Sequence, residues 1–487
     1  MRSSWKTLAA LAAGLIVAPQ LAAADDVQEQ LKKMQERMSQ LEDRLQATTD
    51  QLEVTEERAA EQQALLQKAG VTNAQGSQSG LDAFFDTLEF GGYVDATYNY
   101  NINHGDAGSD FNTTGLSRGN GLQGPGLTDS QGFNLQALKL ELQRPVSVEN
   151  RGGFRADIVF GEQARNLNNL AAGAYPGVIS TQFDPGDYQY EFPYTKSDNQ
   201  VHVSQAYAEY LTPWGDISFK MGKMYTLLGA EVVDSPYNYN VTRSILFYNL
   251  PIEHLGALAE KKYDNGITWA LGVANGWDRD NGADFNKSKT LLGRFGWLGD
   301  NYGVLGNLIY GAEQVDQEDN KRGVFDLVFT ANPIEALAMY LQFDFGWEEF
   351  KNSTVQLGAD QKTPFWWGVA WAGRYAITDR LGVALRAEWF KDDRSGYFCS
   401  RTTGASPSTG ELGNTCSVGL PVNLASSAYE VTATLDYALT SQLTARAEFR
   451  SDWVNNQQGT DRFFRSAWDR NLQSNQQLLA AQLYYRF

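Results

Sequence analysis

Long apolar runs are scarce in this chain of 487 residues. The one clear run, LAALAAGLIVA, lies near the start and is shorter than the about 20 residues that a membrane-spanning helix needs. Arg2 and Lys6 precede it, and three alanines ending at Ala24 follow it. This pattern is typical of a secretory signal peptide. We expect residues 1–24 to be removed on export, and we do not expect helices to hold the mature chain in a membrane.

Cysteine is also rare, with only Cys399 and Cys416 in the chain. Because they are close in sequence and the protein is predicted to be exported, we expect them to form one disulfide. Such a loop closure stabilises the folded state by about 3 kcal/mol on the chain-entropy model. The alternative is two free thiols, which an oxidising compartment disfavours.

The usual catalytic motifs are missing. The chain has three histidines, His104, His202 and His254, and none belongs to a GxSxG, HExxH or CxxC motif. Two acidic segments, GWDRDNGADFNKS and EQVDQEDNKRG, lack the full spacing of a calcium loop. We therefore expect no enzyme activity, no cofactor and no resident metal.

The composition is acidic and rich in glycine. The formal net charge is −18, and there are 46 Gly and 12% aromatic residues. Such a surface makes nucleic acid an unsuitable partner. Abundant glycine and aromatic residues with modest charge indicate many short strands and turns rather than an α/β enzyme.

The segment after the signal peptide has a different periodicity. Apolar residues recur there at alternating steps of three and four, with charged residues between them, which is a heptad seam. We predict a periplasmic α-helical coiled coil over 25–69 that joins copies of the chain, followed by a polar linker over 70–86. The alternative is a single helix lying on another protein or on peptidoglycan. The main seam residues are Leu31, Met34, Met38, Leu41, Leu45 and Leu52.

From residue 87 to residue 487 the chain is predicted to be all-β, with sixteen strands joined by connections that alternate between short and long. Tight turns at one end and long loops at the other are typical of an antiparallel transmembrane β-barrel. The predicted strands are 88–101, 132–145, 152–162, 201–211, 216–226, 254–263, 266–276, 289–298, 302–312, 323–331, 336–348, 365–377, 380–391, 428–438, 441–453 and 475–487.

Side chains alternate along these strands with a period of two. In AMYLQFDFGW, Leu341 and Phe343 share one face, whereas Tyr340 and Asp344 share the other. Charged residues at every second position cannot face an apolar core unpaired. We therefore expect one face to contact lipid and the other to line a water-filled lumen, with strand-end aromatics at the membrane interfaces.

The chain ends within such a strand, LLAAQLYYRF. An open strand edge in lipid would leave backbone groups without partners, so we expect the last strand to pair with the first. An end of this kind, with Phe487, Tyr485 and Leu483 on one face, also resembles the signal that the assembly machinery reads in Gram-negative outer-membrane proteins. Outer-membrane lipids and lipopolysaccharide are then the expected surroundings.

Several segments resemble the OmpL-like β-barrel porin family. They are FGGYVDATYNYN, GFRADIVFGEQ, KMYTLLGAEVVDSPYNYNVTRSILFYNLPIEHLG and GITWALGVANGWD, and the resemblance runs from about Phe90 to Phe487. It implies a pore-forming protein of the outer membrane without known catalytic residues. A periplasmic coiled coil ahead of a barrel is also similar to the arrangement in some sugar-specific porins, which are trimers.

By analogy with general porins, the third long loop, 227–253, is predicted to enter the lumen and form a constriction. A transverse field between acidic loop residues and inward arginines would orient polar solutes. The alternative is that each arginine pairs with a lumen carboxylate. The loop contributes Glu231, Asp234 and Arg243, and the wall contributes Arg155, Arg374, Arg386, Arg446 and Arg450.

Two functions follow from these features. The first is a trimeric diffusion pore for small hydrophilic solutes. The second is a structural anchor that tethers the envelope through its coiled coil. A chain of this length in 16 strands predicts a wide barrel, and barrels of that size leave an aqueous channel, which favours the pore.

Overall fold

The computed structural model describes residues 85, 87–102, 131–171, 199–278, 286–314, 317–349, 363, 365–393, 426–456, 464–465, 472–473 and 475–487. The chain divides into two units, Met1–Thr87 and Leu88–Phe487. The predicted signal peptide and coiled coil, as well as Cys399 and Cys416, lie outside the described residues.

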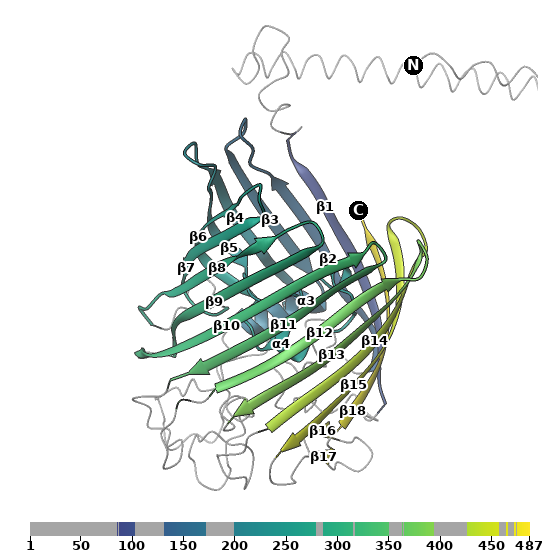
Figure 1. Cartoon of the computed structure of the whole chain (residues 1–487). Helices are drawn as coiled ribbons and strands as arrows, with labels where there is room; N and C mark the ends of the chain where they lie inside the picture. The colour runs from purple at the N-terminus through teal and green to yellow at the C-terminus, as the bar shows by residue number, and fades with distance from the viewer. Residues whose placement is uncertain are drawn as a thin grey trace, which may run out of the picture. The chain divides into compact units, whose positions relative to one another are not determined.

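Sixteen strands of the second unit close into one antiparallel barrel, in which each strand pairs with its neighbours along the chain and β1 pairs with β18 (Figure 1). Every predicted strand is confirmed, with ends that shift by a few residues. The barrel strands are β1 (Glu89–Asn101), β2 (Gln131–Arg144), β3 (Gly152–Phe160), β4 (Val201–Leu211), β5 (Ser218–Tyr225), β6 (Glu253–Lys262), β7 (Ile267–Ala274), β8 (Thr290–Leu298), β9 (Tyr302–Gln314), β10 (Gln317–Ile334), β11 (Leu337–Glu348), β12 (Phe365–Ala376), β13 (Leu381–Asp393), β14 (Ser426–Ala438), β15 (Leu443–Asn456) and β18 (Asn475–Arg486).

The two ends of the barrel differ, as the alternating connection lengths predicted. One end, here called the turn end, carries the short connections 145–151, 212–217, 263–266 and 377–380, among others. Gly266 in one of these turns has a φ of +87°, a conformation that favours glycine. The other end, here called the loop end, carries the long connections. Two short strands, β16 (Phe464–Arg465) and β17 (Leu472–Gln473), lie between β15 and β18 in the sequence. They pair with each other and form a separate two-stranded sheet.

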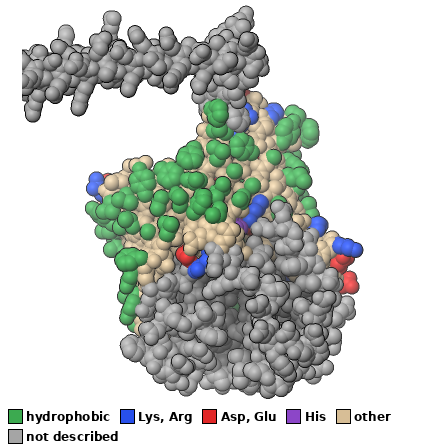
Figure 2. Space-filling model, turned by 180° about the vertical axis from the view of Figure 1, so that it is seen from behind, with side chains coloured by type: hydrophobic (Ala, Val, Ile, Leu, Met, Phe, Trp, Pro, Cys, Tyr) green, Lys and Arg blue, Asp and Glu red, His purple; other side chains and the backbone are tan. Residues whose placement is uncertain are grey.

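The outer face of the barrel is apolar. Leu341 on β11 is 44% exposed and Phe449 on β15 is 44% exposed, whereas their neighbours Gln342 and Glu448 point inward and are buried. Hydrophobic side chains predominate on the wall in view in Figure 2. The alternation of side chains therefore places apolar residues on the outer face of the barrel, as predicted. Within the described parts of the chain, no helix has the length and hydrophobicity needed to cross a membrane.

The barrel closes where the chain ends. The Phe487 N–H donates to the Gly92 carbonyl at 3.0 Å, and the Gly92 N–H donates to the Phe487 carbonyl at 3.1 Å. The Phe487 ring lies 6.0 Å from the Phe90 ring. The last residue thus completes the ladder between β1 and β18, as an edge in lipid requires.

Among the described residues, three short helices lie inside the barrel wall, and the strand pattern did not predict them. They are α3 (Glu162–Ala171), η1 (Ser235–Tyr237) and α4 (Ile245–Tyr248). Figure 1 shows α3 and α4 within the ring of strands. The sequence predicted residue 162 as a strand end and 163–200 as loop. The helix α3 instead buries Ala164 and Leu167 against the interior, because a turn of helix places residues three apart on one face.

Candidate functional site

The loop between β5 and β6, residues 226–252, folds into the barrel; it is called L3 below. Its backbone amides are hydrogen-bonded by inward side chains of the opposite wall. Glu448 on β15 accepts from the N–H groups of Val241 and Thr242 at 2.6 and 3.0 Å. The Asn240 amide donates to the Thr434 hydroxyl on β14 at 2.7 Å. The loop therefore crosses the interior to β14 and β15.

The helix α4 is held by a second wall carboxylate. Glu388 on β13 accepts from the backbone N–H groups of Ile245 and Leu246, both at 2.6 Å. The Ser244 hydroxyl accepts from the Phe247 N–H at 3.0 Å and caps the same helix. These groups satisfy amide donors that the first turn of a helix leaves without intrahelical partners.

Glu231 and Arg386 connect the loop to β13 by charge. Arg386 Nη1 lies 2.7 Å from Glu231 Oε1, and Arg386 Nε lies 2.8 Å from Glu430 Oε2 on β14. The same guanidinium donates to the Thr242 carbonyl at 2.6 Å. Arg386 is fully buried. Its positive charge is therefore neutralised within the wall and the loop instead of facing open water.

Asp234 attaches L3 to a further part of the wall, formed by β1 and β2. Its carboxylate accepts from the Tyr93 hydroxyl on β1 at 2.8 Å and from Lys139 Nζ on β2 at 2.7 Å. Lys139 also lies 3.1 Å from Asp157 on β3. All four groups are buried. L3 is thus attached to β1 and β2 as well as to β13, β14 and β15.

Arg243 links separate segments of L3 to each other. Its three guanidinium nitrogens donate to the carbonyls of Val232, Val241 and Val233 at 2.8, 2.9 and 2.5 Å. Arg450 on β15 in turn donates to the Arg243 carbonyl and lies 2.7 Å from Asp452. These two arginines are therefore structural parts of L3 and of its seat.

The first residues of L3 are held by β10 and β11. The Gly229 N–H donates to Asp326 at 3.0 Å, and the Ala230 N–H donates to the Gln342 side-chain oxygen at 2.9 Å. Asn307 on β9 also donates to Asp326, at 2.6 Å. The start of L3 is thus bonded through its backbone to β10 and β11.

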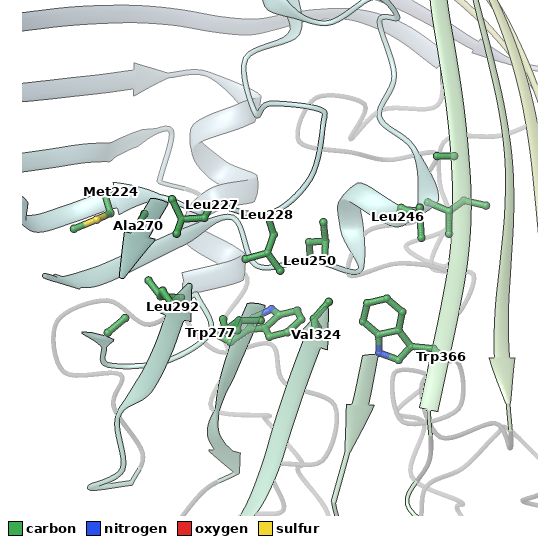
Figure 3. Packing of buried hydrophobic residues seen from close by; sticks show 14 of the residues in the cluster. Met224, Leu227, Leu228, Leu246, Leu250, Ala270, Trp277, Leu292, Val324 and Trp366 are labelled. Carbon is green, nitrogen blue, oxygen red and sulfur yellow. The ribbon is translucent and has the colours of Figure 1, made fainter. Parts of the chain in front are cut away.

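Apolar packing supplies the rest of the attachment. Leu227, Leu228, Leu246 and Leu250 of L3 contact inward apolar side chains of the wall (Figure 3). The prediction of a water-lined inner face therefore holds only in part, because L3 covers an apolar inner surface. That surface includes Leu258, Ala270, Leu292, Ile309, Val324, Trp366 and Phe390.

A smaller apolar cluster joins α3 to L3. Leu167 of α3 packs with Val233, Phe247, Tyr248 and Ile252, all of them buried. Burial raises the pKa of the Tyr248 phenol, so this side chain stays neutral at physiological pH. The helix therefore supports the loop from the β2 to β4 side.

Two of the eight predicted constriction residues are in contact with solvent. The Arg155 side chain on β3 is 23% exposed, and the Arg374 side chain on β12 is 34% exposed. Arg155 is engaged by Asp157 at 2.8 Å and by Glu141 at 3.3 Å. Arg374 Nη2 lies 2.6 Å from Asp436. The other six are buried and mark where L3 is attached.

Arg446 differs from the other buried arginines. Its Nη1 donates to the Ser235 carbonyl at 3.1 Å, and its Nη2 lies 3.4 Å from the Tyr484 hydroxyl. Its guanidinium stands 4.9 Å from the centre of the Tyr484 ring. Within the described part of the barrel it forms no ion pair with a carboxylate.

The described histidines make structural contacts. His202 Nε2 lies 2.9 Å from Glu253, and its Nδ1 lies 2.7 Å from Asn168 of α3. His254 contacts the Gly276 carbonyl and the Thr226 hydroxyl, both at 3.1 Å. Both histidine side chains are buried. The described residues contain no group of three or more acidic, histidine or cysteine side chains arranged to hold a metal.

The carboxylates that bind the L3 backbone were not among the predicted site residues. Glu388 and Glu448 lie on the inward parity of their strands, so the pattern predicted their direction. It did not predict their partners, because these are backbone amides of a distant loop. The predicted terminal residues Leu483 and Tyr485 point outward and are 46% and 40% exposed.

A closed 16-strand barrel with an apolar outer wall and a loop folded into its lumen defines a porin-type outer-membrane β-barrel. The family described as "Putative beta-barrel porin-2, OmpL-like" matches residues 87–487, and the chain belongs to it. The predicted family is therefore confirmed. No curated protein matches the chain.

Solved structures of a porin and of other outer-membrane proteins are similar to this chain. The anion-selective porin from Comamonas acidovorans is 10% identical, with a TM-score of 0.50, covering 82% of this chain and 99% of that chain. OmpT of Vibrio cholerae is 10% identical, with a TM-score of 0.47, covering 82% and 97%. The outer-membrane channel DcaP of Acinetobacter baumannii is 11% identical, with a TM-score of 0.46, covering 82% and 97%. Identities this low concern the fold alone.

Proposed function

We propose that the barrel is a water-filled channel for passive diffusion of small hydrophilic solutes, with L3 as its constriction. The observation that carries the proposal is the loop itself. It enters the lumen and is attached to opposite walls, through Gly229 to Asp326 of β10 on one side and through Asp234 to Lys139 of β2 on the other. A loop fixed in this way narrows a lumen without depending on motion.

The solvent-exposed part of the proposed constriction is polar. Arg155, Glu141 and Arg374 keep part of their side chains exposed on the inner wall. Fixed charges beside water favour polar solutes over apolar ones, since an apolar solute would displace that water without replacing its hydrogen bonds. Chemistry on the solute is not part of the proposal, because the described histidines are engaged in structural contacts.

In this proposal the turn end and the segment 25–69 face the periplasm, and the loop end faces the outside, where it meets lipopolysaccharide. The coiled coil joins three barrels and can also contact peptidoglycan. The alternative function is an anchor that tethers the envelope through the coiled coil. The observation that favours it is the apolar cluster under L3, which fills part of the lumen.

The test is single-channel conductance of the purified full-length mature protein in planar bilayers. Stepwise openings in multiples of three support a trimeric diffusion channel. Removal of residues 25–69 should leave the step size of each barrel unchanged but loosen the grouping in threes. A correctly folded barrel that never conducts would overturn the channel and favour the anchor.

A further inference from the structure

Arg374 reaches across a whole strand to find its partner. It lies on β12, and Asp436 lies on β14, with β13 between them. Its Nε and Nη2 donate to the two oxygens of Asp436 at 2.8 and 2.6 Å. The residue under this bridge is Gly382 of β13, where an added Cβ would lie 2.4 Å from Arg374 Nη2 and 2.7 Å from Asp436. The missing side chain at this position makes room for the bridge.

The bridge fixes the guanidinium and leaves one edge of it unengaged. Nε and Nη2 are both used by Asp436, whereas Nη1 has no hydrogen-bond partner among the described residues. One third of the Arg374 side chain is exposed. Arg155, the other exposed arginine of the predicted set, has Nε, Nη1 and Nη2 all engaged by Asp157 and Gln143. Arg374 is therefore the arginine of that set with a free, oriented and accessible donor.

A tyrosine of L3, Tyr239, lies near Arg374. The Tyr239 ring stacks on the Tyr340 ring of β11, with centroids 6.0 Å apart and an angle of 22° between the planes. Tyr340 pairs with Ala372 on β12, two residues from Arg374. Burial raises the pKa of the Tyr239 phenol, and the nearby Arg374 guanidinium opposes that rise. Tyr239 remains partly exposed.

Asp436 also lies between two positive charges. It is directly opposite Arg446 on β15, which has no ion pair with a described carboxylate. One carboxylate thus faces two guanidinium groups, and Asp95 and Glu448 also lie near Arg446. Because a guanidinium binds a carboxylate through parallel N–H donors, an acidic solute is the ligand that this arrangement suits.

We propose that Arg374 and Tyr239 form a subsite, on the turn-end side of L3, for a small polyhydroxylated acid such as a sugar acid. The carboxylate of the solute accepts from Arg374 Nη1, and a hydroxyl of the solute bonds to the Tyr239 phenol. Asp436 and Gly382 act as positioning residues, because they orient the guanidinium without contacting the solute. The inference rests on the proposed channel function and names its solute class.

Current block by matched solutes tests the subsite. Glucuronate and glucose differ at one carboxylate, so each is added in turn to the turn-end side of single channels of the full-length protein. We expect glucuronate to block with an affinity about tenfold higher than that of glucose, the range of one charge-assisted hydrogen bond. Arg374→Gln should remove the difference, and Tyr239→Phe should reduce it.

Gly382→Ala provides a test that leaves every charge in place. The added methyl group displaces Arg374, so we expect weaker block by glucuronate with an unchanged reversal potential in a salt gradient. Arg151→Gln is the matched control, since Arg151 lies in a turn at the same end and bonds to Asp216. It should keep the wild-type block.

The outcomes separate the two proposals. If the wild-type protein never conducts, the channel function fails, and the subsite fails with it. If the channels open but glucose and glucuronate block them equally, the subsite alone is overturned. A block that falls equally in Arg374→Gln and in Arg151→Gln also overturns it, because the effect would then come from the general field at that end of the barrel.

Discussion

Glu231 of L3 and Arg386 of β13 form an ion pair of 2.7 Å in which the side chains are 4% and 0% exposed. Arg386 also pairs with Glu430, so one guanidinium serves two carboxylates. The two partners are therefore not equivalent. Removing the arginine leaves two buried carboxylates without this partner, whereas removing Glu231 leaves Arg386 paired with Glu430.

We predict that Arg386→Met destabilises the barrel by about 3 to 5 kcal/mol, the cost of leaving buried charges unpaired. Glu231→Gln should cost less, about 1 to 3 kcal/mol, and should increase the current noise as L3 loosens. Guanidinium unfolding in detergent and single-channel recording measure the two effects. Equal losses of stability in the two variants would contradict this account.

The apolar seat of L3 makes a separate prediction. An added Cβ at Gly368 of β12 would lie 2.6 Å from Leu246 Cδ2 and 2.8 Å from the Trp389 carbonyl. We expect Gly368→Ala to displace α4 and to lower the free energy of unfolding by about 1 to 3 kcal/mol. Gly293→Ala is the control, because nothing lies within 4 Å of its added Cβ. Similar stabilities of both variants and the wild type would contradict the packing.

Truncation of the same contact should act through a cavity. Leu246 is fully buried in the cluster with Trp366 and Phe390. We predict that Leu246→Ala lowers the free energy of unfolding by about 2 to 5 kcal/mol. Because the loop also loses part of its seat, the open-channel current should fluctuate more. Denaturant unfolding gives the first quantity, and a stability equal to that of the wild type would show that the loop does not depend on this packing.

A change at the C-terminal residue can distinguish closure of the barrel from recognition by the assembly machinery. In Phe487→Ala the backbone bonds to Gly92 remain possible, and only the ring beside Phe90 is lost. We therefore expect this variant to refold into detergent as the wild type does, but to reach the outer membrane of cells in smaller amounts. Deletion of Phe487 should impair both. Normal assembly of Phe487→Ala in cells would contradict the prediction that Phe487 is part of the assembly signal.

The predicted disulfide is tested by thiol labelling. In exported protein, Cys399 and Cys416 should resist a maleimide until a reductant is added. The single variant Cys399→Ser should instead leave Cys416 open to labelling without reductant. Labelling of the unreduced wild type would show two free thiols.

The strands could be predicted from sequence because alternation and turn residues are local signals. Tyr340 and Leu341 point to opposite faces as predicted, and all sixteen strands occur where the pattern placed them. The same parity gave the inward direction of Arg386 and Arg450. It could not show that both would be buried, because what covers an inward side chain depends on the path of L3.

Two other features could not be predicted from the sequence, for a related reason. Leu292 and Ile309 are inward apolar residues whose role is visible only with L3 in place. The helix α3 is a short segment within a long connection, and its fold depends on packing against L3 rather than on a strong local pattern. The bridge between Arg374 and Asp436 likewise depends on Gly382 of the strand that lies between them, a relationship that no sequence spacing expresses.

L3 is fastened at β1 and β2 on one side and at β10 and β11 on the opposite side. Mechanically, it is a crossbeam set across a tube. A tube without a crossbeam flattens easily under lateral load, whereas one that is tied from wall to wall keeps its cross-section. Lateral pressure in the bilayer therefore acts on the bonds that hold L3, so the width of the proposed constriction and the roundness of the wall change together.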